Sequence, residues 1–148
     1  MGTASSSMTA RDLMSGGEVR CVGEHQSLQD AARLMRDLKV GALPICGDDQ
    51  RLKGMITDRD IVVQCVADGQ DPAQVAAGRF AGPLHWIDAQ ADASEALAVM
   101  ERNRIKRLPV IDVANNHRLC GMITESDVAR RLTDDEIAEF ATQVYAAA

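Results

Sequence analysis

The chain has 148 residues, of which 46% are hydrophobic and only 3% aromatic, so Ala, Val, Leu, Ile and Met must fill its core. Its formal net charge of −6 argues against non-specific nucleic-acid binding, which requires a basic surface. No apolar run reaches the roughly 18 residues of a membrane span, and no pattern of a secretory signal opens the chain, so we expect a cytoplasmic protein that does not enter a membrane.

The first half of the chain predicts five elements in the order β-α-β-β-α. The apolar stretch 19–22 predicts a strand, and helical spacing of apolar residues follows over 28–38. Residues 41–46 and 52–56 predict two strands joined by a polar turn, and helical spacing returns over 58–67. The helix positions expected to face the core are Leu28, Ala31, Ala32, Met35 and Leu38.

The second half of the chain repeats this order. Residues 30–45 align with 95–110, and after a short insertion Gly54 aligns with Gly121. The duplication predicts an α+β fold of two tandem repeats related by a pseudo-twofold axis, followed by a further helix. We assign a flexible tail to residues 1–9, repeat one to 10–68, repeat two to 69–132 and a C-terminal helix to 133–148.

The C-terminal helix has no counterpart in the repeats. It opens with a capping-box pattern, Thr133 followed three residues later by Glu136. Its apolar stripe predicts that it covers an exposed edge or packs on another subunit. Pro44 and Pro109 both stand early in a predicted strand, where we expect a strand start or an edge because proline has no N–H to donate.

The segments "GMITDRD" (54–60) and "GMITESD" (121–127) are near copies of one another. Each predicts a strand that runs into a helix, with Thr57 or Thr124 as the N-cap and Asp60 or Asp127 completing a capping box. The same groups suit a nucleotide, since a helix start offers N–H groups to phosphate and a carboxylate accepts hydrogen bonds from a ribose diol. The glycine would let the strand pass close to a flat ring.

The duplicated unit, with "LPI" or "LPV" before each G-h-h-T-x-x-D motif (h, hydrophobic), resembles the CBS domain, and the tandem resembles a CBS pair, or Bateman module, over residues 10–132. The stretch "GALPICGDDQRLKGMITDRDIV" is similar to the small stand-alone CBS proteins of the hypoxic-response type. The resemblance implies a non-catalytic regulatory module that binds AMP, ADP, ATP or a related adenosyl compound between its repeats. It also implies a homodimer formed through the CBS helices.

The resemblance also implies a set of ligand-binding residues. Those expected at the ribose and phosphates are Thr57, Asp60, Arg59, Lys106, Arg107, Thr124 and Asp127. Those expected around adenine are Cys21, Val22, Ala42, Leu43, Pro44, Trp86, Ile87, Leu108 and Pro109.

The two predicted nucleotide sites differ in charge. Lys106 and Arg107 precede "LP" in repeat two, whereas Gly41 and Ala42 precede it in repeat one. Arg59 lies inside the first motif, where the second has serine. Since bonds to charged groups are the stronger ones, we expect the Asp60 site to be favoured over the Asp127 site.

The sequence also allows other functions. The chain shows no local signature of a Ser/His/Asp or Cys/His catalyst and no phosphate-binding glycine loop, so we expect no enzyme. The alternatives are a nucleotide-free, stress-related structural or interaction protein and a metal-binding CBS protein. Four cysteines without a CxxC pair favour buried thiols over a disulfide framework: Cys21, Cys46, Cys65 and Cys120.

Overall fold

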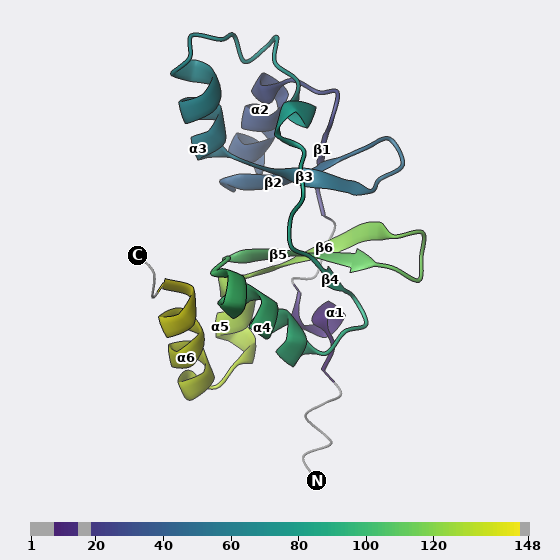
Figure 1. Cartoon of the computed structure of the whole chain (residues 1–148), viewed down its shortest axis with the longest axis vertical. Coiled ribbons are helices and arrows are strands. Elements are labelled where there is room, and N and C mark those ends of the chain that lie inside the picture. Colours follow the sequence, from purple (N-terminus) through teal and green to yellow (C-terminus); the bar gives the residue numbers. More distant parts are fainter. Residues whose placement is uncertain (1–7, 15–18, 146–148) are drawn as a thin grey trace. The chain divides into compact units, whose positions relative to one another are not determined.

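The structure, a computed structural model, describes residues 8–14 and 19–145 (Figure 1). Residues 1–7 of the expected tail lie outside this description. The chain divides into two compact units: residues 20–84 form one, and the described residues of 1–19 and 85–148 form the other. None of the described helices is long and apolar enough to cross a membrane.

The unit of residues 20–84 is built on a three-stranded sheet of order β1-β2-β3, in which β1 runs parallel and β3 antiparallel to β2. Its elements are β1 (Val22–Gly23), α2 (Leu28–Leu38), β2 (Ala42–Cys46), β3 (Leu52–Thr57), α3 (Asp58–Ile61), the π-helical segment η2 (Val62–Val66) and the 3-10 helix η3 (Ala77–Phe80).

The ends of α2 follow from local chemistry. Ser27 and Asp30 cap its start reciprocally, and Lys39 ends it in the left-handed conformation. Leu28 and Met35 are buried against the sheet, as the helical spacing predicts, whereas Ala32 is exposed and that expectation is wrong.

The other unit has the same sheet, of order β4-β5-β6. Its elements are α1 (Ala10–Leu13), β4 (Ile87–Asp88), α4 (Ala93–Asn103), β5 (Arg107–Asp112), β6 (Arg118–Thr124), α5 (Glu125–Arg131) and α6 (Asp134–Tyr145). The strand register repeats as well, because Leu108 pairs with Ile123 as Leu43 pairs with Ile56. The predicted α+β fold of two β-α-β-β-α repeats with a C-terminal helix is confirmed.

The C-terminal helix α6 packs on α4 within its own unit, where Phe140 and Val144 are buried. Thr133 and Glu136 form the predicted capping box at its start. The helix therefore covers a face of repeat two that in repeat one has no covering helix among the described residues.

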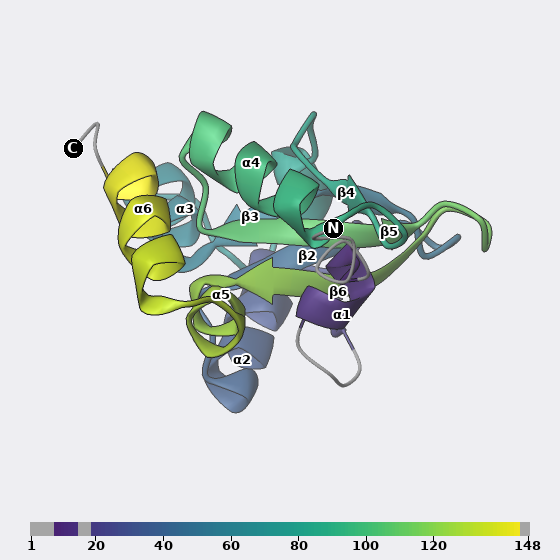
Figure 2. The same cartoon turned by 90° about the horizontal axis from the view of Figure 1, so that it is seen from below.

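Each compact unit contains a segment that precedes the other repeat in the sequence. In the unit 20–84, Leu28 N donates to Val75 O at 2.9 Å and Ala77 N donates to Gln26 O at 2.7 Å. In the other unit, Ala10 N donates to Ala91 O at 2.8 Å, and Figure 2 shows α1 beside β6. The compact units therefore differ in extent from the sequence repeats 10–68 and 69–132.

The prolines lie in the central strand of each sheet, but beyond the reach of its short parallel neighbour. Strand β1 pairs with Ile45 and Cys46 of β2 and does not extend to Pro44. Strand β4 likewise pairs with Val110 and Ile111, one residue beyond Pro109. Each proline thus has a paired strand on one side only, as in an edge strand, where proline is tolerated.

Candidate functional site

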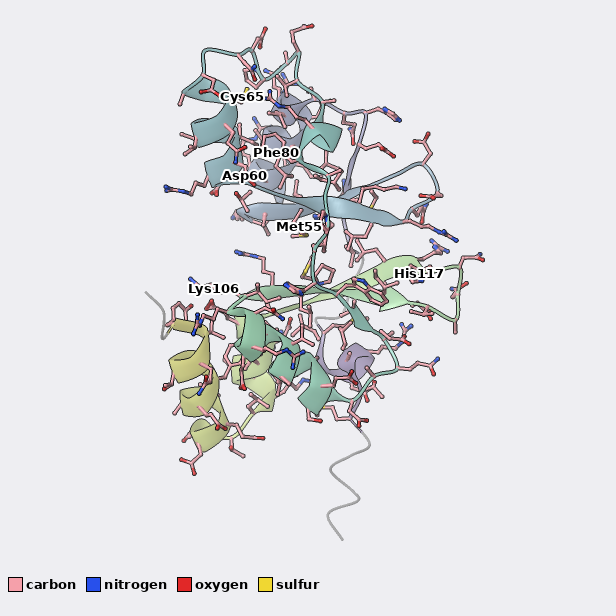
Figure 3. The ribbon with its side chains drawn as sticks, in the orientation of Figure 1. Met55, Asp60, Cys65, Phe80, Lys106 and His117 are labelled. Carbon is pink, nitrogen blue, oxygen red and sulfur yellow. A yellow bond between two sulfur atoms is a disulfide. The ribbon has the colours of Figure 1, made fainter. Side chains whose placement is uncertain are left out.

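The first motif carries its Thr and Asp at the junction of β3 and α3. Thr57 N donates to Asp60 Oδ2 at 2.9 Å, and Asp60 N donates to Thr57 Oγ1 at 3.1 Å. The other carboxylate oxygen, Asp60 Oδ1, accepts a long bond of 3.4 Å from Gln64 Nε2. Asp60 is partly exposed, and Figure 3 shows it on α3. Capping therefore uses one oxygen of Asp60 and leaves the other only weakly engaged.

In the second motif both oxygens of the carboxylate make close contacts. Thr124 donates to Asp127 Oδ2 through both its backbone N, at 2.8 Å, and its hydroxyl, at 3.1 Å. Arg130 pairs with Asp127 Oδ1 from the next turn of α5. Asp127 is only 1% exposed and is the buried charged residue of the described core. Both of its oxygens are thus engaged by groups of its own repeat.

The predicted cations lie in different surroundings. Arg59 is exposed on α3, next to Asp60 in the chain. Arg107 is exposed at the start of β5, where it pairs in register with Thr124. Lys106, labelled in Figure 3, places its Nζ 4.4 Å from the ring centroid of Tyr145. The structure therefore brings Arg59 to the first motif, and Lys106 and Arg107 to the second.

Most residues predicted around adenine contribute to the core of their own unit. Val22, Leu43, Ile87 and Leu108 are each at most 5% exposed. Pro44 and Pro109 are buried, and Ala42 and Cys21 are half-buried. Among these predicted adenine residues, the aromatic one is Trp86. It is 40% exposed and meets the His117 ring edge-on at a centroid distance of 5.2 Å. The assignment of these residues to an adenine pocket stays a prediction.

Three residues next to the motifs were missed by sequence reasoning. Arg130 stands three residues after Asp127, and Gln64 stands four after Asp60, so helical spacing could have indicated both. Tyr145 reaches the second motif from the far end of α6, and no local signal predicts that contact.

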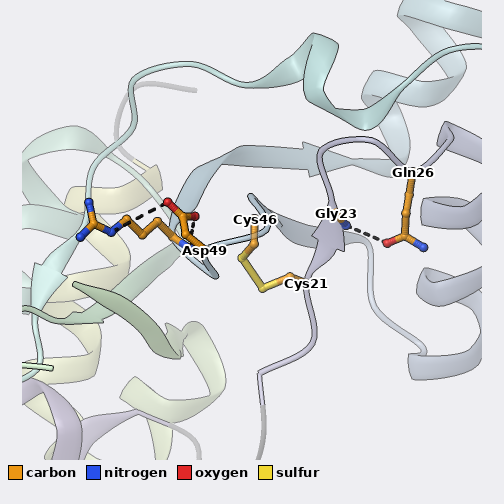
Figure 4. Close-up of a disulfide and its surroundings, with 6 residues drawn as sticks. Cys21, Gly23, Gln26, Cys46 and Asp49 are labelled. Atoms are coloured by element: carbon orange, nitrogen blue, oxygen red, sulfur yellow. Dashed lines mark hydrogen bonds and ion pairs between the residues drawn. A yellow bond between two sulfur atoms is a disulfide. The ribbon is translucent and has the colours of Figure 1, made fainter. Parts of the chain in front are cut away.

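The cysteines correct one expectation. Cys21 and Cys46 form a disulfide that joins the residue before β1 to the end of β2, so the expectation of free thiols is wrong for this pair (Figure 4). Next to it, Gly23 N donates to Gln26 Oε1 at 2.7 Å. Cys65 and Cys120 are free, and burial raises the pKa of the Cys120 thiol.

The described residues contain no group of three or more His, Cys, Asp or Glu side chains that could hold a metal ion. Two of the four cysteines are also engaged in the disulfide.

The sequence model of the CBS domain matches residues 10–66 and 81–134. The chain belongs to the CBS-domain family. It is 50% identical over 133 residues to Hypoxic response protein 1 of Mycobacterium tuberculosis, and the match covers 89% of this chain and 90% of that protein.

Solved structures support the same assignment. A crystal structure of Hypoxic Response Protein I with two coordinated zinc ions is 52% identical, with a TM-score of 0.75 over 85% of this chain and all of that one. CBSX2 in complex with AMP is 22% identical, with a TM-score of 0.68 over 83% of this chain and 94% of that one. At this identity the second likeness shows the fold alone.

Proposed function

We propose that this CBS protein is a non-catalytic regulatory module that binds an adenosyl nucleotide of the AMP, ADP or ATP class, at the Asp60 motif in preference to the Asp127 motif. The observation that carries the proposal is the difference between the two carboxylates. Asp60 is partly exposed, with one oxygen held only by a 3.4 Å contact, whereas Asp127 is buried and paired with Arg130. That a CBS protein of the same fold is described in complex with AMP supports the ligand class.

In this proposal each group has a separate task. The Asp60 carboxylate accepts hydrogen bonds from the two ribose hydroxyls, while Thr57 keeps the carboxylate in place through the capping box. Arg59 is the cation proposed for a phosphate at the Asp60 motif, and Lys106 and Arg107 are the cations proposed for a phosphate at the Asp127 motif, which they adjoin. Trp86 is proposed to contact the adenine, since its exposed indole can stack on a base.

The nucleotide proposal is tested by thermal shift together with fluorescence, because Trp86 is the only tryptophan of the chain. AMP, ADP, ATP and S-adenosylmethionine are each titrated into the protein. A ligand at 100 times its Kd adds about 2.7 kcal/mol to the free energy of unfolding by mass action. We expect at least one adenosyl compound to raise the Tm and change the Trp86 emission.

Asp60→Asn should abolish this response. Asp37→Asn is the matched control, because Asp37 is an exposed helix residue paired only locally with Arg36 among its described contacts. Protection of the wild type by none of the adenosyl compounds would sink the proposal. Loss of protection in Asp127→Asn, with Asp60→Asn unaffected, would move the site to the second motif.

We also propose that the protein is a homodimer through the helices of repeat one. The segment η2 exposes three valines, Val62 at 58%, Val63 at 47% and Val66 at 55%. Exposed apolar side chains gathered in one short segment are typical of a protein interface. Light scattering should show a dimer, and Val63→Glu should give a monomer, with Ala67→Glu, an exposed change just after η2, as the control. A wild-type monomer at micromolar concentration would contradict this proposal.

A zinc function is less well supported by this chain. The relative described with two zinc ions is 52% identical, but the described residues offer no metal-binding group. A nucleotide-free interaction protein, as the similarity to a hypoxic response protein would allow, is the alternative if no adenosyl compound binds. Elemental analysis of the purified protein distinguishes the zinc function from the nucleotide-free alternative, because only a metal-binding protein retains stoichiometric zinc.

A further inference from the structure

Tyr145, in the last turn of α6, contacts two charged residues of repeat two. Its hydroxyl donates to Glu125 Oε1, and its ring lies 4.4 Å below the Lys106 ammonium. The ring is 46% exposed, so these are contacts at the surface of the unit. The hydrogen bond to Glu125 raises the pKa of the Tyr145 phenol, because the bond favours the protonated, donating form.

Both partners of Tyr145 adjoin the second motif. Glu125 follows Thr124 directly, and Lys106 precedes Arg107, which pairs with Thr124 between β5 and β6. Tyr145 therefore bridges the residues that adjoin these paired strand ends. The lysine before β5 and the glutamate after β6 are joined through this single side chain.

Repeat one has different residues at the positions equivalent to Lys106 and Glu125. Lys106 aligns with Gly41 and Glu125 aligns with Asp58. There the Asp58 carboxylate approaches Gly41 so closely that a Cβ on Gly41 would lie 3.1 Å from Asp58 Oδ2. Only repeat two has both a lysine at this position and a helix that supplies an aromatic ring to it.

The position of the ring is set by the packing of α6. Phe140 and Val144 are 4% and 5% exposed in the core shared with α4, and the Thr133–Glu136 capping box defines the helix start. Because Val144 is buried next to it in the chain, Tyr145 is held at the surface beside Lys106.

We propose that Tyr145 is a specificity-determining positioning residue, which holds the Lys106 ammonium on its ring and so limits the affinity of the protein for phosphorylated ligands. The inference rests on the proposed function, in which Lys106 is a phosphate ligand. One ammonium cannot sit on the ring and meet a phosphate at full strength at the same time. Binding a phosphate therefore requires Lys106 to leave Tyr145, and this lowers the affinity for nucleotides but not for a nucleoside.

The inference is tested with adenosine, AMP and ATP on Tyr145→Ala and Tyr145→Phe. We expect Tyr145→Ala to bind AMP and ATP about two- to fivefold more tightly, which matches the strength of an exposed cation–π contact. Adenosine, which has no phosphate, should bind with unchanged affinity. Tyr145→Phe keeps the ring and should lie closer to the wild type. Gln143→Ala, an exposed change in the same turn, is the control.

The combined variant Tyr145→Ala/Lys106→Ala isolates the lysine. It should lose the gain of Tyr145→Ala, because the gain is assigned to the freed ammonium. A gain that persists in the combined variant, or that is equally large for adenosine, would overturn the inference. Failure of the proposed function looks different, since the wild type would then bind neither adenosine nor any nucleotide.

A measurement without ligand tests the contact between Tyr145 and Lys106 independently of nucleotide binding. The chain has three lysines, Lys39, Lys53 and Lys106, so acylation of Lys106 can be compared by mass spectrometry with two internal references. Tyr145→Ala should raise the acylation rate of Lys106 about twofold relative to Lys39 and Lys53, as expected when an exposed cation–π contact is lost. An unchanged ratio would refute the positioning role of Tyr145 even if nucleotides bind.

Discussion

Ala81 lies against Gly54, the glycine of the first motif, so closely that no side chain fits between them. A Cβ on Gly54 would lie 2.9 Å from Ala81 Cα and 3.0 Å from Phe80 O. The two residues form an isolated antiparallel bridge, and Gly82 N donates to Lys53 O at 2.9 Å. The sequence predicts that this glycine makes room for a flat ring, and for Gly54 that prediction is wrong, because the protein's own backbone occupies the space.

Gly54→Ala should therefore destabilise the protein without any ligand. The added methyl group meets backbone atoms that can move only with their segment, and overpacking of this kind lowers the free energy of unfolding by about 1–3 kcal/mol. Urea unfolding measures the change. Gly82→Ala is the control, since no described atom lies within 4 Å of its Cβ position. Equal stability of the two variants would show that the segment 80–82 is not held against β3.

Asp127→Ala should destabilise the protein more than Asp60→Ala. Both changes remove a capping carboxylate, which lowers stability by about 1 kcal/mol. Asp127 is in addition buried and bonded to Arg130, so its loss removes a charge-assisted bond and should total about 2–3 kcal/mol. Urea unfolding in the absence of nucleotide compares the two. A larger loss in Asp60→Ala would mean that the first motif, not the second, is the structural one.

The local spacing of residues in the sequence predicts much of the fold and part of the candidate site. The capping pairs Thr57–Asp60 and Thr133–Glu136 follow from residues three apart, and the strands follow from short apolar runs. What local spacing did not predict depends on contacts between distant segments. Cys21 and Cys46 are separated by 25 residues, and Tyr145 reaches Lys106 only because α6 packs on α4. The sequence predicts unequal nucleotide sites from their cations, and this stays a prediction; the structure shows instead that Asp127 is buried and Asp60 is partly exposed.

Reduction of the disulfide should lower stability. A bridge that closes a loop of 25 residues restricts the unfolded chain and contributes about 3 kcal/mol. Unfolding by urea is measured with and without dithiothreitol. The double variant Cys21→Ala/Cys46→Ala should show no response to reductant, because its two remaining cysteines are free in the folded protein. If wild-type stability does not change on verified reduction, the sheet holds these two segments without the bond.

Glu101→Gln should raise stability at neutral pH. Burial, and secondarily the nearby charge of Glu139, raise the pKa of Glu101 above its usual 4.5. A carboxyl whose pKa is higher in the folded than in the unfolded state favours folding when protonated, and this contribution is lost as the pH rises through the folded pKa. At neutral pH the ionised Glu101 therefore opposes the packing of α6 on α4. Glutamine removes the charge, so the Tm of Glu101→Gln should exceed that of the wild type at pH 7 and converge with it as the pH falls below 4.5.

Glu95→Gln, an exposed change in the first turn of α4, should give no such gain. A gain in Glu101→Gln that persists unchanged at pH 4 would assign it to packing rather than to charge.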